Sequence, residues 1–144
     1  MPTYETSTTI HADPEKIWPV LADVVNWPRW TPTVTKVEVI DSARMGMGAR
    51  FEVHQPKLRP AVWTVTRVEP PTRFLWESRL PGLLMVADHV IESAPDGTSR
   101  LTLRFGFEGL LGRIAGPLNR KRVEGYIARE AASLRSLFEN GATR

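Results

Sequence analysis

The clearest hydrophobic pattern in the chain lies in its last quarter, from Arg120 to Glu139. With a rotation of about 100° per residue, most of its apolar residues fall in one arc of a helix and most charged residues fall outside it. The arc contains Val123, Tyr126, Ile127, Ala131, Leu134, Leu137 and Phe138. One acid, Glu130, lies near the centre of the arc. The pattern predicts a helix of about five turns with a long apolar face interrupted by one carboxyl group.

A second apolar stripe precedes this helix and points to a different side. It contains Leu111, Ile114, Ala115 and Leu118, and the change of direction falls at Gly116-Pro117. Proline removes a backbone donor and clashes with the preceding turn, so it kinks or ends a helix. We therefore predict a short helix or turn, a kink and then the long helix.

Elsewhere the chain contains runs in which apolar and polar residues alternate, as in strands with one buried face. Tyr4–Ile10 is the first such run. Six more follow further along the chain, separated by turn residues: Val34–Ile40, Ala49–Gln55, Ala61–Val68, Arg73–Leu80, Leu84–Ser93 and Arg100–Glu108. Short connections of this kind join antiparallel neighbours. The pattern predicts one strand and then a six-stranded antiparallel meander.

Two short helices are predicted between the first strand and the meander. Asp13-Pro14-Glu15 is a strong helix start, because Asp is a preferred N-cap and Pro suits the first helical position. Pro19 lies beyond the first turn, where it removes an internal hydrogen bond, so this helix should be short or distorted. The segment Asn26–Trp30 can start the second short helix. Together with the meander and the long helix, these elements predict an α+β fold with one domain over residues 1–144.

The turns partly determine which residues of the sheet face the long helix. Tight turns at Pro70-Pro71 and Pro81-Gly82 place Trp63, Trp76 and His89 on one face. A tight turn at Asp96-Gly97 would instead pair the aromatic residues of the last strand with the face of Asp88. Both arrangements hold only if a bulge or an odd-length loop intervenes. We favour the aromatic face, with His89 inward and an irregularity in the last hairpin, but the register that turns Asp88 inward stays open.

Composition narrows the possible chemistry. The 144 residues include no cysteine, which excludes disulfides and thiolate metal sites. The three histidines, His11, His54 and His89, are not paired at metal-ligand spacing, so we expect no metal site. The chain also lacks a P-loop, a dinucleotide-binding glycine pattern and a nucleophile elbow. We therefore expect no cofactor.

Charge and hydropathy restrict the partners. The net charge is +3, and residues 109–144 contain seven Arg or Lys against three Glu. No aromatic residues alternate with these charges as in single-strand binders, so we expect no nucleic acid partner. No apolar run is long enough to span a bilayer, and the N-terminus lacks the features of a signal peptide. We therefore expect a cytoplasmic protein without a transmembrane segment.

Several segments resemble the polyketide cyclase/dehydratase and lipid transport family of the START/Bet v 1-like (SRPBCC) superfamily. They are His11–Trp18, Asp23, Asn26–Trp30, Val68–Trp76, Asp96-Gly97-Thr98 and the Arg-Glu-Ala-x-x-Leu pattern within Tyr126–Leu134. The resemblance covers essentially the whole chain, and Pro19 departs from it. It implies a helix-grip fold, in which a seven-stranded antiparallel sheet curls round the C-terminal helix and leaves a cavity between them. Members of this family bind or transform very different apolar molecules.

A cavity of this kind would be lined by inward-facing residues. The candidate ligand-binding residues are Trp30, Phe51, Trp63, Trp76, Met85, His89, Phe105, Tyr126 and Glu130. Trp63 and Trp76 could equally be core packing, because each aromatic residue buries a large area, whereas Trp30 is expected at the mouth of the pocket. His89 is a candidate catalytic group or a satisfied interior histidine. An unpaired buried carboxylate is costly to keep ionised, so Glu130 should find donors, such as an Arg or Trp side chain or a backbone N–H, or take up a proton.

Three hypotheses of function follow. The first is a protein that binds a small hydrophobic ligand, which is aromatic, polyketide-like or lipid-like, beneath the long helix. The second is a cyclase or dehydratase that uses His89 and a nearby acid. The third is an interaction protein that acts through the basic face of the C-terminal helix. The presence of a pocket would separate the first two from the third, and a base within reach of a substrate proton would separate the second from the first.

Overall fold

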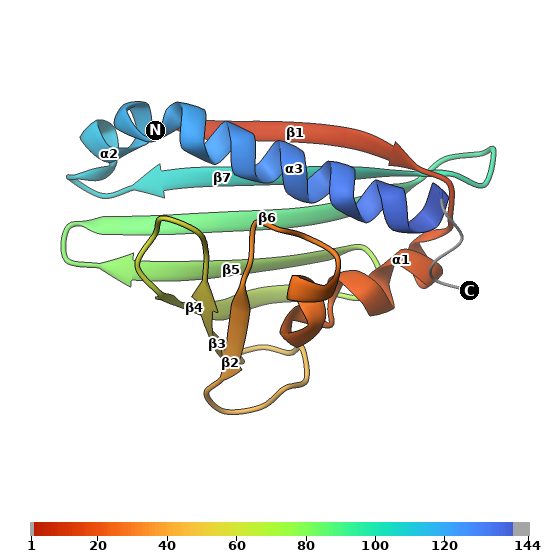
Figure 1. Ribbon diagram of the computed structural model, residues 1–144, viewed down its shortest axis with the longest axis horizontal. Coiled ribbons are helices and arrows are strands. Elements are labelled where there is room, and N and C mark those ends of the chain that lie inside the picture. Colours follow the sequence, from red (N-terminus) through yellow and green to blue (C-terminus); the bar gives the residue numbers. More distant parts are fainter. Residues whose placement is uncertain (1, 140–144) are drawn as a thin grey trace.

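A seven-stranded antiparallel sheet forms the body of the molecule, and a long helix crosses one of its faces (Figure 1). The computed structural model describes residues 2–139. The strands are β1 (Thr3–Ile10), β2 (Lys36–Val39), β3 (Arg50–His54), β4 (Ala61–Glu69), β5 (Arg73–Leu80), β6 (Leu83–Ser93) and β7 (Ser99–Glu108). Their order in the sheet is β1-β7-β6-β5-β4-β3-β2. The meander is therefore continuous, and β1 extends it by pairing with the last strand.

The helices occur where the sequence predicts them. They are α1 (Pro14–Leu21), the 3-10 helix η1 (Val24–Arg29), α2 (Gly112–Leu118) and α3 (Arg120–Glu139). The break between α2 and α3 follows Pro117, as predicted. The first strand of the meander is shorter than predicted, because Val34 and Thr35 precede β2. The observed elements confirm the predicted α+β class and the sheet with a long C-terminal helix.

Two irregularities keep the aromatic residues of the sheet on the face toward α3. In the last hairpin, Ser93 pairs with Ser99 across the odd-length loop 94–98, and His89 consequently pairs with Leu103. This confirms the irregularity predicted there. The second irregularity was not predicted: the turn after β4 has three residues, 70–72, and a bulge between Val65 and Arg67 restores the register.

The bulge in β4 matters because the side-chain period of a strand is two. Glu69 pairs with Arg73 at the turn, and a regular ladder from that pair would place Trp76 opposite Thr66. After the bulge Trp76 pairs with Val65 instead, so Trp63 and Val65 share its face. Both residues are buried, at 5% and 1% exposure.

Trp27 anchors the two short helices to the sheet. Its indole Nε1 donates a hydrogen bond of 2.9 Å to the carbonyl oxygen of Leu21, at the end of α1. Its ring lies 5.4 Å from Trp76 and 5.7 Å from His89, measured between centroids. Because Trp27 is 2% exposed and packs on these rings, it holds η1 against the inner face of the sheet.

α2 packs on the sheet through glycines. Gly112 and Gly116 are its buried residues. A Cβ atom at Gly112 would lie 2.9 Å from the carbonyl carbon of Phe107, and one at Gly116 would lie 2.4 Å from Cβ of Pro2. The close approach requires a residue without a side chain at both positions.

We predict that Gly112→Ala destabilises the protein, whereas Gly125→Ala does not. The added methyl at Gly112 meets backbone atoms that cannot rotate away, which should lower the unfolding free energy by about 1–3 kcal/mol. Gly125 lies in α3 with no atom within 4 Å of an added Cβ, so alanine there should stabilise by about 0.5–1 kcal/mol. Urea denaturation measures both changes. Equal effects at the two positions would contradict the close packing of α2.

Candidate functional site

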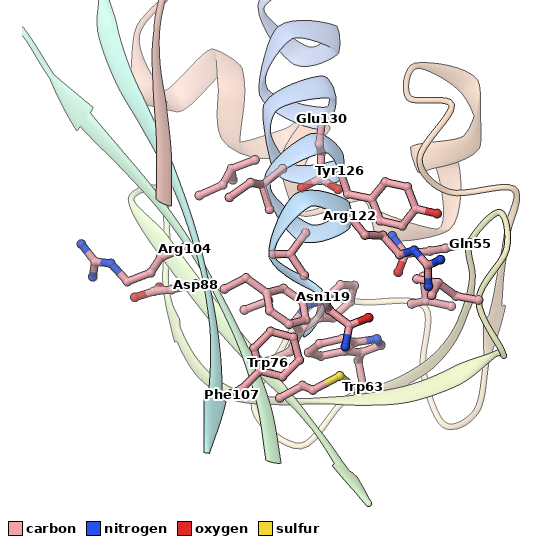
Figure 2. A pocket seen from close by; sticks show the side chains of 18 of the residues that line it. Gln55, Trp63, Trp76, Asp88, Arg104, Phe107, Asn119, Arg122, Tyr126 and Glu130 are labelled. Atoms are coloured by element: carbon pink, nitrogen blue, oxygen red, sulfur yellow. The ribbon is translucent and has the colours of Figure 1, made fainter. Parts of the chain in front are cut away.

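A pocket of about 190 Å³ lies between α3 and the inner face of the sheet. Its walls are mainly apolar, and six of the lining residues are Phe, Trp or Tyr: Trp27, Trp63, Trp76, Phe105, Phe107 and Tyr126. Figure 2 shows Trp63, Trp76 and Phe107 at one end of this space and Glu130 on α3 at the other. The pocket therefore has an aromatic end on the sheet and a polar group on the helix.

Neighbouring strands hold the aromatic rings against one another. The ring of Trp63 lies 5.6 Å from that of Trp76, with 31° between their planes, and 5.8 Å from that of Phe105. Trp63 and Trp76 come from the adjacent strands β4 and β5, and Phe105 comes from β7. Contacts of this length fix large flat surfaces in place. The wall is thus formed by rigid side chains on a sheet.

His89 lines the pocket as a neutral imidazole. Its Nδ1 lies 3.2 Å from the carbonyl oxygen of Phe74, which can only accept, so Nδ1 carries the proton and Nε2 is an acceptor. Its ring stacks on the ring of Phe74 with 4.0 Å between centroids. Burial lowers the pKa of His89 to about 4 and outweighs the opposing hydrogen bond to Phe74. The histidine is therefore uncharged at neutral pH.

Asp88 lies on the other face of the sheet. Its carboxylate accepts hydrogen bonds of 2.9 and 2.7 Å from Nε and Nη2 of Arg73. Figure 2 shows the side chains of Asp88 and Arg104 on the opposite side of the strands from Trp76. The register that turns Asp88 inward is thus wrong, and this carboxylate is not the acid that could accompany His89.

Glu130 extends from α3 toward the pocket, which it lines (Figure 2). The side chain is half-buried, because part of its surface borders the pocket and the rest is covered by protein atoms. Within residues 2–139 no hydrogen bond or ion pair involves its carboxyl group, so the donor predicted from the sequence is absent. Desolvation raises the pKa of Glu130 to about 8. The acid therefore takes the other predicted course and is mostly protonated at neutral pH.

Polar groups on α2, α3 and one loop surround the rest of the pocket. Tyr126 donates a hydrogen bond to the carbonyl oxygen of Pro56, which ties α3 to the β3–β4 loop. Asn119 donates through Nδ2 to the carbonyl oxygen of Ala115 at 2.7 Å, so its side-chain oxygen remains an acceptor. Arg122 is exposed and also lines the pocket. These groups can orient a ligand that the apolar walls only enclose.

The structure brings together most of the residues selected from the sequence. Trp63, Trp76, Met85, His89, Phe105, Tyr126 and Glu130 all line the pocket. Trp30 and Phe51 do not. Phe51 is fully buried, with its ring 6.3 Å from that of Trp76. The Nε1 atom of Trp30 is buried and has no partner in the described chain, while its ring packs 5.7 Å from Trp27 rather than at a pocket mouth.

Trp27 and Arg122 also line the pocket, although the sequence pattern did not predict either of them there. Arg122 could have been found from its spacing, because positions 122, 126 and 130 recur every four residues and share one side of a helix. Trp27 gives no comparable signal, since its place depends on how the loop after β1 folds back onto β5 and β6. Only the tertiary packing reveals it.

One group of possible metal ligands occurs in the described part of the chain, away from the pocket. Donor atoms of Glu38, Glu52 and His54 lie within 4.8 Å of one another. Lys36 already pairs with Glu38 at 2.5 Å, and His54 with Glu52 at 2.9 Å. The acids therefore have partners within the protein itself, on strands β2 and β3.

The sequence of this chain matches a protein family and a characterised relative. The family described as "Polyketide cyclase / dehydrase and lipid transport" matches residues 1–139. A granaticin polyketide synthase bifunctional cyclase/dehydratase of Streptomyces violaceoruber is 32% identical over 150 residues, which cover 95% of this chain and 44% of the relative. The chain thus spans less than half the length of that relative.

Solved structures share the fold at low sequence identity. The Zhui aromatase/cyclase from Streptomyces sp. R1128 has a TM-score of 0.75 and 19% identity, covering 95% of this chain and 93% of that chain. The di-domain ARO/CYC BexL from the BE-7585A biosynthetic pathway has a TM-score of 0.72 and 20% identity, covering 94% and 46%. Ara h 8.0201 has a TM-score of 0.64 and 16% identity, covering 93% and 97%. These likenesses show the fold, in which a sheet grips a long C-terminal helix.

None of the described helices combines the length and the apolar character needed to cross a membrane.

The pH dependence of stability tests the state of Glu130. Below its ordinary pKa of 4.5, this acid is protonated in both folded and unfolded chains; between 4.5 and about 8 it ionises only when unfolded. The stability that the protonated Glu130 contributes is therefore fully present below pH 4.5. It is lost progressively as the pH rises from 4.5 through about 8, by a few kcal/mol in total. Glu130→Gln should remove this loss. Urea denaturation at several pH values gives the unfolding free energy of wild type and variant. The difference between the two isolates Glu130, because the titration of His89 contributes equally to both and cancels.

A difference that stays constant from pH 4.5 to above 8 would contradict this prediction, because it would mean that Glu130 is solvated as an ordinary surface acid. Glu124→Gln is a matched control, since Glu124 is exposed on the same helix. Its difference from wild type should vary little over that range.

Proposed function

The chain belongs to the polyketide cyclase/dehydrase and lipid transport family, and we propose that it binds a small, largely apolar ligand between its sheet and α3. The ligand class is aromatic, polyketide-like or lipid-like. The observation that carries the proposal is the pocket with aromatic walls at this position. Binding sites of this kind enclose apolar surface with a few polar groups that fix orientation.

The arrangement of polar groups supports a ligand that carries oxygen atoms. Glu130 in its protonated form can donate a hydrogen bond, whereas Nε2 of His89 and the side-chain oxygen of Asn119 can accept one. A hydroxyl or carbonyl group on the ligand would supply the missing partners. Flat rings would then stack against Trp63 and Trp76 at the other end. A ligand with an aromatic part and oxygen substituents satisfies both ends of the pocket.

A cyclase or dehydratase is the second candidate, and two groups in the pocket favour it. His89 offers an unshared lone pair on Nε2, and Glu130 offers a proton at neutral pH. Removal of water from a β-hydroxy ketone needs a base for the C–H proton and an acid for the departing hydroxyl, while the C=C bond forms. The pKa of about 4 makes His89 a weak base, which places this candidate behind simple binding.

The third hypothesis, interaction through the basic face of α3, draws less support from the structure. Arg120 pairs with Glu124 at 3.4 Å and Arg135 with Glu139 at 2.6 Å along the same helix. Such pairs are typical of a solvated helix surface.

Binding can be tested with the neutral fluorescent dye N-phenylnaphthylamine. Trp76→Leu keeps an apolar group in place but removes a stacking surface, so it should weaken dye binding by about 1–3 kcal/mol. Ala87→Leu adds volume at the pocket wall and should weaken it as well. Trp30→Leu is the matched control, because Trp30 does not line the pocket. Dye fluorescence titration measures the affinity of all three variants. If Trp76→Leu and Ala87→Leu fold and bind the dye like the wild type, the dye does not bind in this pocket.

Turnover distinguishes the enzyme from the binding protein. With an aromatic β-hydroxy ketone as probe, a dehydratase should lose about 10²–10⁴-fold in rate on either His89→Gln or Glu130→Gln, since each change removes one proton-transfer group. Both variants should still bind the dye. Absorbance of the conjugated product measures the rate. Equal rates in wild type and both variants would reject acid–base catalysis by this pair while leaving the binding proposal intact.

A further inference from the structure

The large apolar residues of α2 face solvent while its glycines face the protein. Gly112 and Gly116 are buried, whereas Ile114 is 61% exposed and Leu118 is 79% exposed. A helix on the surface of a globular domain normally buries its large apolar side chains and exposes small or polar ones. α2 has the opposite arrangement, and its apolar side chains are available to something outside the described chain.

Two neighbouring turns extend this exposed surface. Leu110 and Leu111, at the turn from β7 to α2, are 82% and 49% exposed, and Leu80 at the end of β5 is 52% exposed. The backbone N–H of Leu111 donates to the carbonyl oxygen of Gly82 at 2.8 Å, which holds the β5–β6 turn against this segment. Figure 1 shows α2 and both turns at the same end of the molecule.

We call Leu80, Leu110, Leu111, Ile114 and Leu118 the apolar tip. Single exposed leucines are ordinary, but five large apolar side chains at the same end of a molecule are typical of an interaction surface.

The chain segment that carries most of the apolar tip contains only positive charges, between Glu108 and Glu124. From Gly109 to Val123 the sequence has four Arg or Lys and no Asp or Glu. Within residues 2–139, Arg113, Lys121 and Arg122 take part in no ion pair, and all three are exposed. An apolar surface bordered by cations is complementary to a layer that is apolar inside and negatively charged at its surface.

We propose that the apolar tip docks on a lipid bilayer that contains anionic phospholipids. The leucine side chains enter the boundary between headgroups and acyl chains, and Arg113 and Lys121 contact phosphate groups. A second copy of the chain fits less well, because a symmetric contact would bring the same cations face to face. The tip consists of side chains from two separate segments, Leu80 and residues 110–118, and a fluid bilayer can accept them without a matched pocket.

Docking of the apolar tip is a property separate from ligand binding, and it would set where the pocket lies relative to the membrane. Ala115, Asn119 and Arg122 line the pocket and belong to the same stretch of chain as the apolar tip. With the tip on a bilayer, this wall of the pocket lies next to the membrane. An apolar ligand could then move between the two without crossing bulk water, which such a molecule avoids.

Co-sedimentation of the full chain with vesicles tests the proposal. The protein should bind phosphatidylcholine vesicles that contain about 30% phosphatidylglycerol, bind phosphatidylcholine alone much more weakly, and dissociate as salt is added. The double variant Ile114→Ser/Leu118→Ser should bind about tenfold more weakly or worse. Arg113→Gln/Lys121→Gln should weaken binding as well and reduce its salt dependence. All variants should bind N-phenylnaphthylamine as the wild type does, which shows an intact fold and separates docking from ligand binding.

The matched control is Met47→Ser. Met47 is 68% exposed and lies in the connection between β2 and β3, at a different part of the molecule from α2 (Figure 1). The control should bind vesicles like the wild type. Equal loss in the control, equal binding to both kinds of vesicle, or no binding by the wild type would each overturn the proposal. Self-association in sedimentation equilibrium that disappears in Ile114→Ser/Leu118→Ser would also overturn it, since a second copy would then cover the tip.

Discussion

The register of the sheet is the constraint on which the rest of the structure depends. Because side chains alternate between the two faces of a strand, a slip of one residue would turn Trp63, Trp76 or His89 into solvent. The odd-length loop between β6 and β7 and the bulge in β4 each correct such a slip. The aromatic face that covers α3 exists only because both corrections are present.

The same packing leaves a pocket where α3 meets this face. Large rings held against each other from neighbouring strands cannot shift to fill the space beneath the helix, and Glu130 brings a carboxyl group to it without a partner. Filling this volume with apolar side chains would stabilise the domain. The protein instead keeps an acid that burial holds protonated and a histidine that burial holds neutral, and such perturbed groups are commonest at functional sites.

α2 shows a second departure from what stability alone would favour. Its glycines allow it to approach Phe107 and Pro2 closely, but its larger apolar side chains remain in water. Pro117 lies in the last turn of this helix, and the chain breaks after Leu118 before α3 begins. The pocket and the apolar tip meet along this short segment, because Ala115 lines the pocket while Ile114 and Leu118 belong to the tip.

Local chemistry in the sequence determined the elements, their order and the α+β class. The alternation of apolar and polar residues identified the strands, and the helical periodicity of apolar residues identified α3. Pro117 marked the break before α3. These signals depend only on neighbours along the chain. They also selected seven residues that meet in the pocket. Tertiary structure decided the rest. The bulge in β4, the place of Trp27, the burial of Phe51 behind Trp76 and the lack of a donor for Glu130 all depend on contacts between segments far apart in sequence. No local pattern contains that information, since the side chains of Trp27 and Glu130 acquire their surroundings only when the sheet closes around α3.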